Sequence, residues 1–266
     1  RVFMATETVT RVNWTRPQTL AALHIYLQLP FGQLHQRNPK IKQLAQWLGR
    51  TPGSIALKLV NLASLDPMIV ASGRAGMANA SALDRRLWEE LQTHWDAVAL
   101  EAAAEYEKLA NGHGEVADAE LLETDSPVVE EGRSRSAIVQ VRVNQARFRK
   151  AVLASYNATC CISGLRHEKL VIASHIVPWA EDTQNRLNPQ NGLCLSALHD
   201  RAYDQGLITV LPDFTVRVSP KLKIASGDDF IKESLMRFDK QGIHLPERFG
   251  PSPVFLTKHA QRFGFM

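Results

Sequence analysis

Three polar side chains with the chemistry of phosphodiester hydrolysis follow one another in one short stretch of this sequence. His175 ends an apolar segment, Asn191 lies in a turn and His199 begins a segment with helical spacing. Hydrolysis of a phosphodiester needs a base to activate water and positive charge to stabilise the leaving oxygen. A histidine is the natural base near neutral pH. We therefore assign His175 as the candidate general base.

The other members of this set have more than one interpretation. The amide of Asn191, in the turn Asn-Pro-Gln-Asn-Gly, could clamp the loop and orient His175, or it could bind a metal. His199 is a candidate metal ligand. Asp204 would reach the same metal if the helix ends near Tyr203. Otherwise it would orient His199 without contacting the metal itself. Each residue alone is more often structural than catalytic, so the hypothesis depends on the ordered set.

The ordered set resembles the HNH endonuclease family. Residues 160–209 carry a His-Ile-x-Pro-Trp strand end, an Asn-Gly-Leu turn and a His…Tyr-Asp helix, a combination frequent in bacterial restriction endonucleases. The resemblance implies a compact ββα-metal fold. Two N-terminal stretches, residues 29–32 and 48–52, also resemble proteins of the restriction group.

The resemblance implies a role for each residue. His175 matches the general base, Asn191 the central asparagine and His199 the metal-binding histidine, with one divalent cation, Mg²⁺ or Mn²⁺, in each active site. Many members place Asp or His directly before the base, where this chain has Ser174. Either the Ser174 oxygen binds the metal weakly, or Asp204 and water complete the ligand set, or the site is impaired.

Cysteine usage argues against two other kinds of site. The chain has 3 cysteines among 266 residues, too few for a disulfide framework or a four-cysteine zinc site. Ser163 and Gly164 stand where zinc-binding members of the family would carry a second cysteine. We therefore expect no structural zinc, and we expect buried thiols in a reducing cytoplasm.

The composition is that of an ordinary globular protein, with 45% hydrophobic and 22% charged residues. No apolar run reaches the length of a membrane span and no signal peptide is evident, so we expect a cytoplasmic protein. Residues 1–90 carry 11 basic against 5 acidic side chains, residues 91–136 carry 3 against 11, and residues 137–266 carry 17 against 11. Two basic blocks around an acidic connector favour a polyanionic partner such as double-stranded DNA.

Apolar spacing predicts helices in the first basic block. One begins after Thr15, a second covers residues 40–48 and stops at Gly49, and a third is capped by Thr51. The last two are typical of a helix-turn-helix, or of a helical hairpin that only packs. A helix-turn-helix would present four candidate DNA-contacting residues on its second helix, namely Arg50, Ser54, Lys58 and Asn61.

The rest of the sequence predicts a linker, followed by a region that contains both helices and strands. Residues 111–136 are acidic and interrupted by Gly and Pro, which is typical of a mobile tether. A basic helix over residues 144–156 would offer Arg147 and Lys150 to DNA. The other expected elements are strands at residues 160–163 and 170–174, a hairpin at 207–211 and 214–218, and a helix at 228–238.

Together these features predict an α+β protein with a helical, helix-turn-helix-like domain at residues 1–110, a linker at 111–136 and an HNH nuclease domain at 137–266. We expect metal-dependent DNA cleavage in bacterial restriction, with any dependence on modified bases left open. Two other hypotheses are a DNA-binding regulator with an inactive HNH domain, and an effector whose N-terminal domain senses a partner other than DNA. Because double-strand cutting usually takes two active sites, we expect a homodimer. The long helical pattern over residues 81–109 is its candidate interface.

Overall fold

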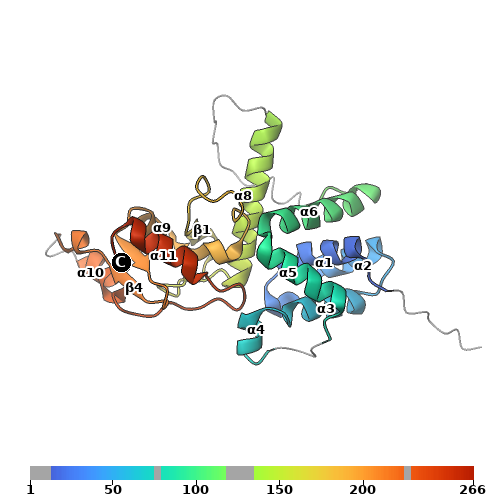
Figure 1. Cartoon of the computed structure of the whole chain (residues 1–266), viewed down its shortest axis with the longest axis horizontal. Helices are drawn as coiled ribbons and strands as arrows, with labels where there is room; N and C mark the ends of the chain where they lie inside the picture. Colours follow the sequence, from blue (N-terminus) through green and yellow to red (C-terminus); the bar gives the residue numbers. More distant parts are fainter. Residues whose placement is uncertain (1–12, 75–78, 118–134, 225–228) are drawn as a thin grey trace, which may run out of the picture.

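The computed structural model describes residues 13–74, 79–117, 135–224 and 229–266. Its first two stretches form a helical N-terminal half, and the last two form a C-terminal half that combines helices with two small sheets. Figure 1 shows α8 (Arg135–Ser155) between α1 to α6 on one side and the strands on the other. One continuous hydrophobic core contains residues of both halves. The predicted α+β class is therefore confirmed.

The helices of the N-terminal half begin where the capping residues predict. Thr15 and Gln18 form a capping box at the start of α1 (Arg16–Gln28). Thr51 caps α3 (Pro52–Ala63), and Gly49 adopts φ +61° in the turn before it. The other helical elements here are η1 (Phe31–Gln33), α2 (Pro39–Trp47), α4 (Pro67–Ala71), α5 (Ala82–Thr93) and α6 (Trp95–Gly112).

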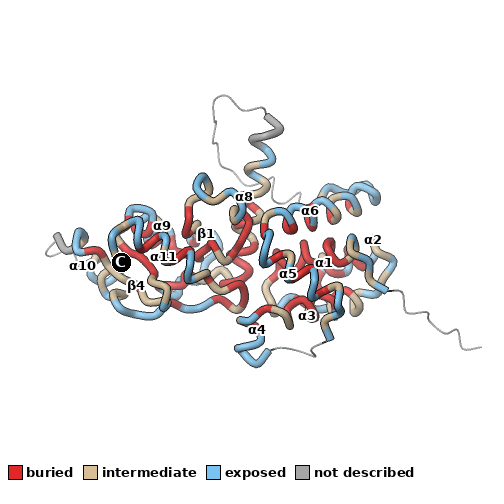
Figure 2. The backbone as a smooth tube through the Cα atoms, in the orientation of Figure 1, coloured by how far each residue is buried: buried red, intermediate tan, exposed pale blue. Residues whose placement is uncertain are grey.

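Helix α1 is the centre of the N-terminal half. Every residue from Thr19 to Gln28 is buried, and the helix packs against α3 and α6. Figure 2 shows the burial along α1 and the exposed outer surfaces of the helices around it. A helix that is enclosed on all sides has to satisfy its last carbonyl groups inside the protein rather than with water.

The predicted helix-turn-helix surface is not confirmed. Lys58 and Asn61 are buried, with 3% and 9% of their surface exposed, so the expectation that α3 presents them to DNA is wrong. The reason is that this face of α3 packs on α5, where the Lys58 ammonium lies 2.6 Å from the equally buried Asp84 carboxylate. Arg50 binds the Asn13 carbonyl at 2.9 Å and stacks on a tryptophan ring, and Ser54 is half-buried.

The helical pattern over residues 81–109 is two helices rather than one. The chain breaks between α5 and α6 at His94, where φ is −135° and ψ is 60°. The apolar residues of the pattern, including Leu87, Leu91 and Trp95, are buried in the chain's own core. Because that face is already covered by the chain's own core, it does not support the expected dimer interface at these residues.

The acidic segment at residues 111–136 is helical or packed at both described ends. Helix α6 continues to Gly112, and the Glu115 carboxylate accepts a hydrogen bond from Trp47 Nε1 at 3.3 Å. Helix α8 begins at Arg135, earlier than the predicted residue 144. Residues 118–134 lie outside the described part of the chain. The boundaries of the three predicted segments stay predictions.

The C-terminal half contains a ββα arrangement. Strand β1 (Val171–His175) pairs antiparallel with β2 (Gly192–Ser196), and α9 (Ala197–Asp204) follows β2 directly. The predicted hairpin forms as β3 (Ile208–Val210) and β4 (Val216–Val218). The remaining helical elements are η2 (Glu168–Leu170), η3 (Pro189–Asn191), η4 (Pro220–Ile224), α10 (Asp229–Ser234), η5 (Met236–Phe238) and α11 (Pro253–Arg262).

Two predicted elements of this half are wrong. Residues 160–163 form a turn instead of a strand, in which the Gly164 N–H donates to the Cys160 carbonyl at 2.9 Å. The predicted helix over 228–238 divides into α10 and η5 at Leu235, whose φ of −128° is not helical. In both places a local turn satisfies backbone groups that a longer element would otherwise pair.

Two predictions from composition can be compared with the structure. Cys160, Cys161 and Cys194 are free and buried, which confirms the expectation of buried thiols. Among the helices described, none has both the length and the apolar character needed to cross a bilayer.

A fully buried arginine joins the two halves. The Arg248 guanidinium donates to the carbonyl groups of Tyr26 and Leu27, in the last turn of α1, and the Leu27 bond is 3.3 Å long. It also lies 4.7 Å from the Tyr26 ring centre and 5.2 Å from that of Phe249. The buried Asp66 carboxylate accepts the Phe249 N–H at 3.0 Å and contributes opposite charge. Arg248 therefore satisfies carbonyl groups that α1 leaves without helical partners.

We expect Arg248→Met to lower the free energy of unfolding by about 3 kcal/mol, because it leaves buried carbonyl groups unpaired and Asp66 without its counter-charge. Urea denaturation measures this change. Arg37→Met, at an exposed site, is the control and should change stability by less than about 0.5 kcal/mol. Equal, small effects of the two substitutions would contradict a joining role for Arg248.

Candidate active site

His175 is held at the end of β1 by one hydrogen bond and two aromatic rings. Its Nε2 lies 3.0 Å from the Arg186 carbonyl, which can only accept, so Nε2 carries the proton and Nδ1 keeps its lone pair. The ring stacks on Phe148 of α8 with centres 3.6 Å apart and meets the edge of Trp179 at 5.5 Å. Burial lowers the pKa of His175, opposed by the bond to Arg186. The residue is therefore neutral near pH 7, as a general base must be.

The close approach of α8 to the strands depends on a glycine in β2. A Cβ added at Gly192, the β-pair partner of His175, would lie 2.5 Å from Val152 Cγ2 and 2.9 Å from Phe148 Cζ. Side-chain contacts of that length do not occur, so a larger residue would push α8 away. The missing side chain of Gly192 lets Phe148 lie flat against His175.

Asn191 clamps the loop between the strands. Its Oδ1 accepts from Val177 N at 2.8 Å, and its Nδ2 donates to the carbonyls of Val177 at 3.1 Å and Asn185 at 3.2 Å. The side chain is 1% exposed. Because the amide is engaged at both ends, these contacts favour the loop-clamping interpretation of Asn191 over metal binding.

A carboxylate of the N-terminal half holds the same loop from outside. Asp96, in the first turn of α6, accepts the Arg186 N–H at 3.0 Å and the Leu187 N–H at 2.8 Å. Burial raises the pKa of Asp96, and the two backbone bonds oppose that rise. The peptide group between Arg186 and Leu187 is thus fixed at its nitrogen by Asp96 and at its oxygen by His175. No local sequence pattern indicates this contact, because Asp96 reads as an ordinary acidic residue near a helix start.

His199 lies inside the protein. Its Nε2 is 2.8 Å from the Ser234 carbonyl, and its Nδ1 is 2.9 Å from Ser196 Oγ and 3.5 Å from Cys160 Sγ. Only 3% of the residue is exposed. Both ring nitrogens are engaged by protein groups, so no lone pair is directed at a cation in this arrangement. These contacts favour a buried histidine that fixes α9 over the expected metal ligand.

The next residue of α9 faces the candidate site instead. Asp200 and Asp204 are four positions apart, which places both carboxylates on one face of the helix. Burial raises the pKa of Asp200, the Ser174 hydroxyl lowers it and the charge of Asp204 raises it further. Burial also raises the pKa of Asp204, opposed by Arg201. The spacing of the two aspartates was a signal that sequence reasoning could have used.

Ser174 points towards Asp200. Its hydroxyl is close enough to favour the charged form of Asp200, yet the geometry falls short of a full hydrogen bond, and its oxygen is buried without a conventional partner among the described residues. Two carboxylates and a hydroxyl are oxygen ligands of the kind that Mg²⁺ and Mn²⁺ prefer. These residues therefore fit a divalent cation, although no cluster of three His, Cys, Asp or Glu occurs within the described ranges.

The two basic residues predicted on α8 do not join this site. Arg147 is paired with Glu107 of α6, and its side chain is 10% exposed. Lys150 lines a cavity on the side of α8 away from Phe148. The remaining predicted DNA-contacting residues belong to the N-terminal half, as described above.

We expect Asp96→Asn to lower kcat about 10- to 100-fold with little change in KM, because an amide can accept only one of the two loop N–H bonds and His175 loses its orientation. The measurement is kcat and KM for cleavage of a DNA substrate across pH. A shift of the acid limb of the pH–kcat profile identifies a positioning role, because a purely structural defect would lower kcat at every pH without shifting that limb. Glu101→Gln, exposed on the same helix, is the control and should leave both constants unchanged. A wild-type pH profile in Asp96→Asn would contradict the prediction.

Comparison with known proteins agrees with this geometry. No curated protein matches the chain. Residues 160–211 match the family model described as HNH endonuclease. The match contains β1, β2 and α9 with His175, Asn191 and the two aspartates of α9. This chain therefore carries an HNH endonuclease domain at residues 160–211.

Proposed function

We propose that the protein is a metal-dependent DNA endonuclease. The observation that supports this most strongly is His175, neutral and with Nδ1 unprotonated, at the same strand end as Ser174 and the carboxylates of α9. Successive strand residues point to opposite sides, so Ser174 faces α9 while His175 faces α8. A phosphodiester lying across the end of β1 would meet a base on one side and a cation-binding group on the other.

Each residue has a role in hydrolysis. His175 takes a proton from water on Nδ1, and the Arg186 carbonyl, bound to Nε2–H, stabilises the positive ring that forms. Asp200, Asp204 and Ser174 would hold a Mg²⁺ or Mn²⁺ ion. When bound, such an ion stabilises negative charge on the phosphate and on the leaving oxygen. Asn191 and Asp96 keep the loop in place. The expected products carry a 5′-phosphate and a 3′-hydroxyl.

The aspartate pair also bears on the hypothesis of an inactive domain. Ser174 is a poor ligand by itself, but Asp200 and Asp204 add two carboxylates on one face of α9, which are the oxygen ligands that Mg²⁺ and Mn²⁺ prefer. This favours an active nuclease over a DNA-binding regulator without cleavage. We further propose a role in bacterial restriction, on the family resemblance, and a homodimer to cut both strands.

We expect Asp200→Asn to reduce plasmid cleavage at least about 100-fold, because it removes one of the two carboxylates. Cleavage is followed with Mg²⁺ and with Mn²⁺ over a range of concentrations, on unmodified and on cytosine-modified plasmid. His199→Gln is the matched control: we expect a lower melting temperature and an unchanged metal dependence. If His199→Gln alone abolished metal-dependent cleavage while Asp200→Asn did not, our ligand assignment would be wrong.

We expect kcat/KM to fall on the acid side only below pH 6.5. The pKa of His175 is lowered from its ordinary value of 6.5, so its base form persists to more acidic pH. The raised pKa values of Asp200 and Asp204 oppose cation binding as pH falls, which steepens the same limb. A pH–rate profile at saturating Mg²⁺ measures this. His175→Ala should abolish cleavage at every pH, and an acid limb centred above pH 6.5 would contradict the assigned base.

A further inference from the structure

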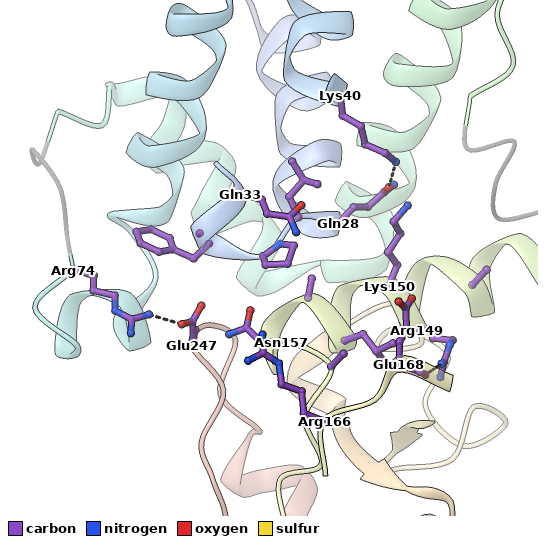
Figure 3. A pocket seen from close by; sticks show the side chains of 18 residues that line it. Gln28, Gln33, Lys40, Arg74, Arg149, Lys150, Asn157, Arg166, Glu168 and Glu247 are labelled. Atoms are coloured by element: carbon purple, nitrogen blue, oxygen red, sulfur yellow. Dashed lines mark hydrogen bonds and ion pairs between the residues drawn. The ribbon is translucent and has the colours of Figure 1, made fainter. Parts of the chain in front are cut away.

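A large cavity lies where the two halves meet, away from the candidate active site. Its volume is about 1160 Å³, larger than most small-molecule sites. Figure 3 shows side chains from both halves around it: Gln28, Gln33 and Lys40 approach from the N-terminal half, and Lys150, Asn157 and Arg166 from the opposite side.

The cavity is strongly basic. Two acidic residues, Glu168 and Glu247, line it. The Arg149 guanidinium donates to the backbone oxygens of Val171 and Glu168, each at 2.9 Å, and both of these acceptors are uncharged. Five cationic side chains line the cavity: Lys40, Arg74, Arg149, Lys150 and Arg166. Such an excess of positive charge in a recess favours an anionic ligand.

The uncharged part of the lining has a different chemistry. The half-buried Phe31 ring and the neighbouring Leu29 and Pro30 give one wall an apolar surface. The amides of Gln33 and Asn157 offer both donors and acceptors. An aromatic ring beside amide groups is suited to a planar heterocycle with polar edges, and the cations are suited to phosphate groups.

Helix α8 separates this cavity from the candidate active site. Phe148 and Val152 face β1 and β2, where they contact His175 and approach Gly192. Lys150 and Leu153 lie on the opposite face of the helix and line the cavity. A phosphate held at Lys150 is therefore on the wrong side of α8 to be attacked by water activated at His175.

We propose that this cavity binds a nucleotide-sized ligand that carries at least two phosphates. Lys40 from α2 and Lys150 from α8 hold the phosphates together with Arg166, and the wall around Phe31 holds the base. Because these side chains come from both halves, the ligand ties α2 to α8 and stabilises the folded protein. The proposal does not depend on nuclease activity.

The test uses the full chain, with ADP, GDP and pyrophosphate as probes and adenosine as the uncharged comparison. Isothermal titration at low ionic strength should show one ADP or GDP per chain, with weaker binding of pyrophosphate and much weaker binding of adenosine. Thermal unfolding should shift upward with nucleotide concentration. Lys40→Gln together with Lys150→Gln should weaken nucleotide binding at least about tenfold for each lysine removed.

Two controls keep the outcomes distinct. Lys42→Gln, exposed on α2 and outside the cavity, should bind like the wild type, and so should His175→Ala, which tests independence from cleavage. Failure of the wild type to bind ADP, GDP and pyrophosphate at millimolar concentration would overturn the proposal. A loss of nucleotide binding in Lys42→Gln equal to that in the double variant would also overturn it. Displacement of ADP by duplex DNA, with a parallel loss of DNA binding in the double variant, would assign the cavity to duplex DNA instead.

Discussion

The candidate active site depends on the peptide group between Arg186 and Leu187, which is held at both ends. Asp96 accepts its N–H, that of Leu187, at 2.8 Å, and His175 donates to its carbonyl, that of Arg186, at 3.0 Å. The first contact comes from a helix of the N-terminal half, and the second sets the tautomer of the base. Docking of the two halves therefore adds a second support to a loop that Asn191 already clamps from within its own half, and so helps to keep the Nδ1 lone pair of the base available.

Arg248 stabilises the docked arrangement of the two halves. Its guanidinium is fully buried, so its removal from water has a cost that only good partners offset. The partners are the last carbonyl groups of α1, two aromatic rings and the charge of Asp66. Because α1 is buried over nearly its whole length, water cannot substitute for the guanidinium. The same contact thus completes the core of one half and attaches the other.

On α9, adjacent residues have opposite roles because a helix turns by about 100° per residue. His199 points inward, where Ser196 and Ser234 occupy its ring nitrogens, and Asp200 points towards Ser174. A ring bound on both sides is well suited to fixing the helix. Burial raises the pKa of both carboxylates, the charge of Asp204 raises that of Asp200 further, and a divalent cation would relieve that cost.

By itself the sequence determined the features that depend on residues close together in the chain. Thr15 and Thr51 set helix starts through their caps, the order of His175, Asn191 and His199 indicated the ββα arrangement, and the spacing of Asp200 and Asp204 already puts them on one helix face. Only the tertiary structure decided which face of each helix is buried and which other elements it contacts. It buried Lys58 against Asp84, brought Asp96 to the loop beside His175, and opened a basic cavity between α2 and α8. These contacts join residues far apart in sequence, and their packing geometry leaves no local pattern from which they could be predicted.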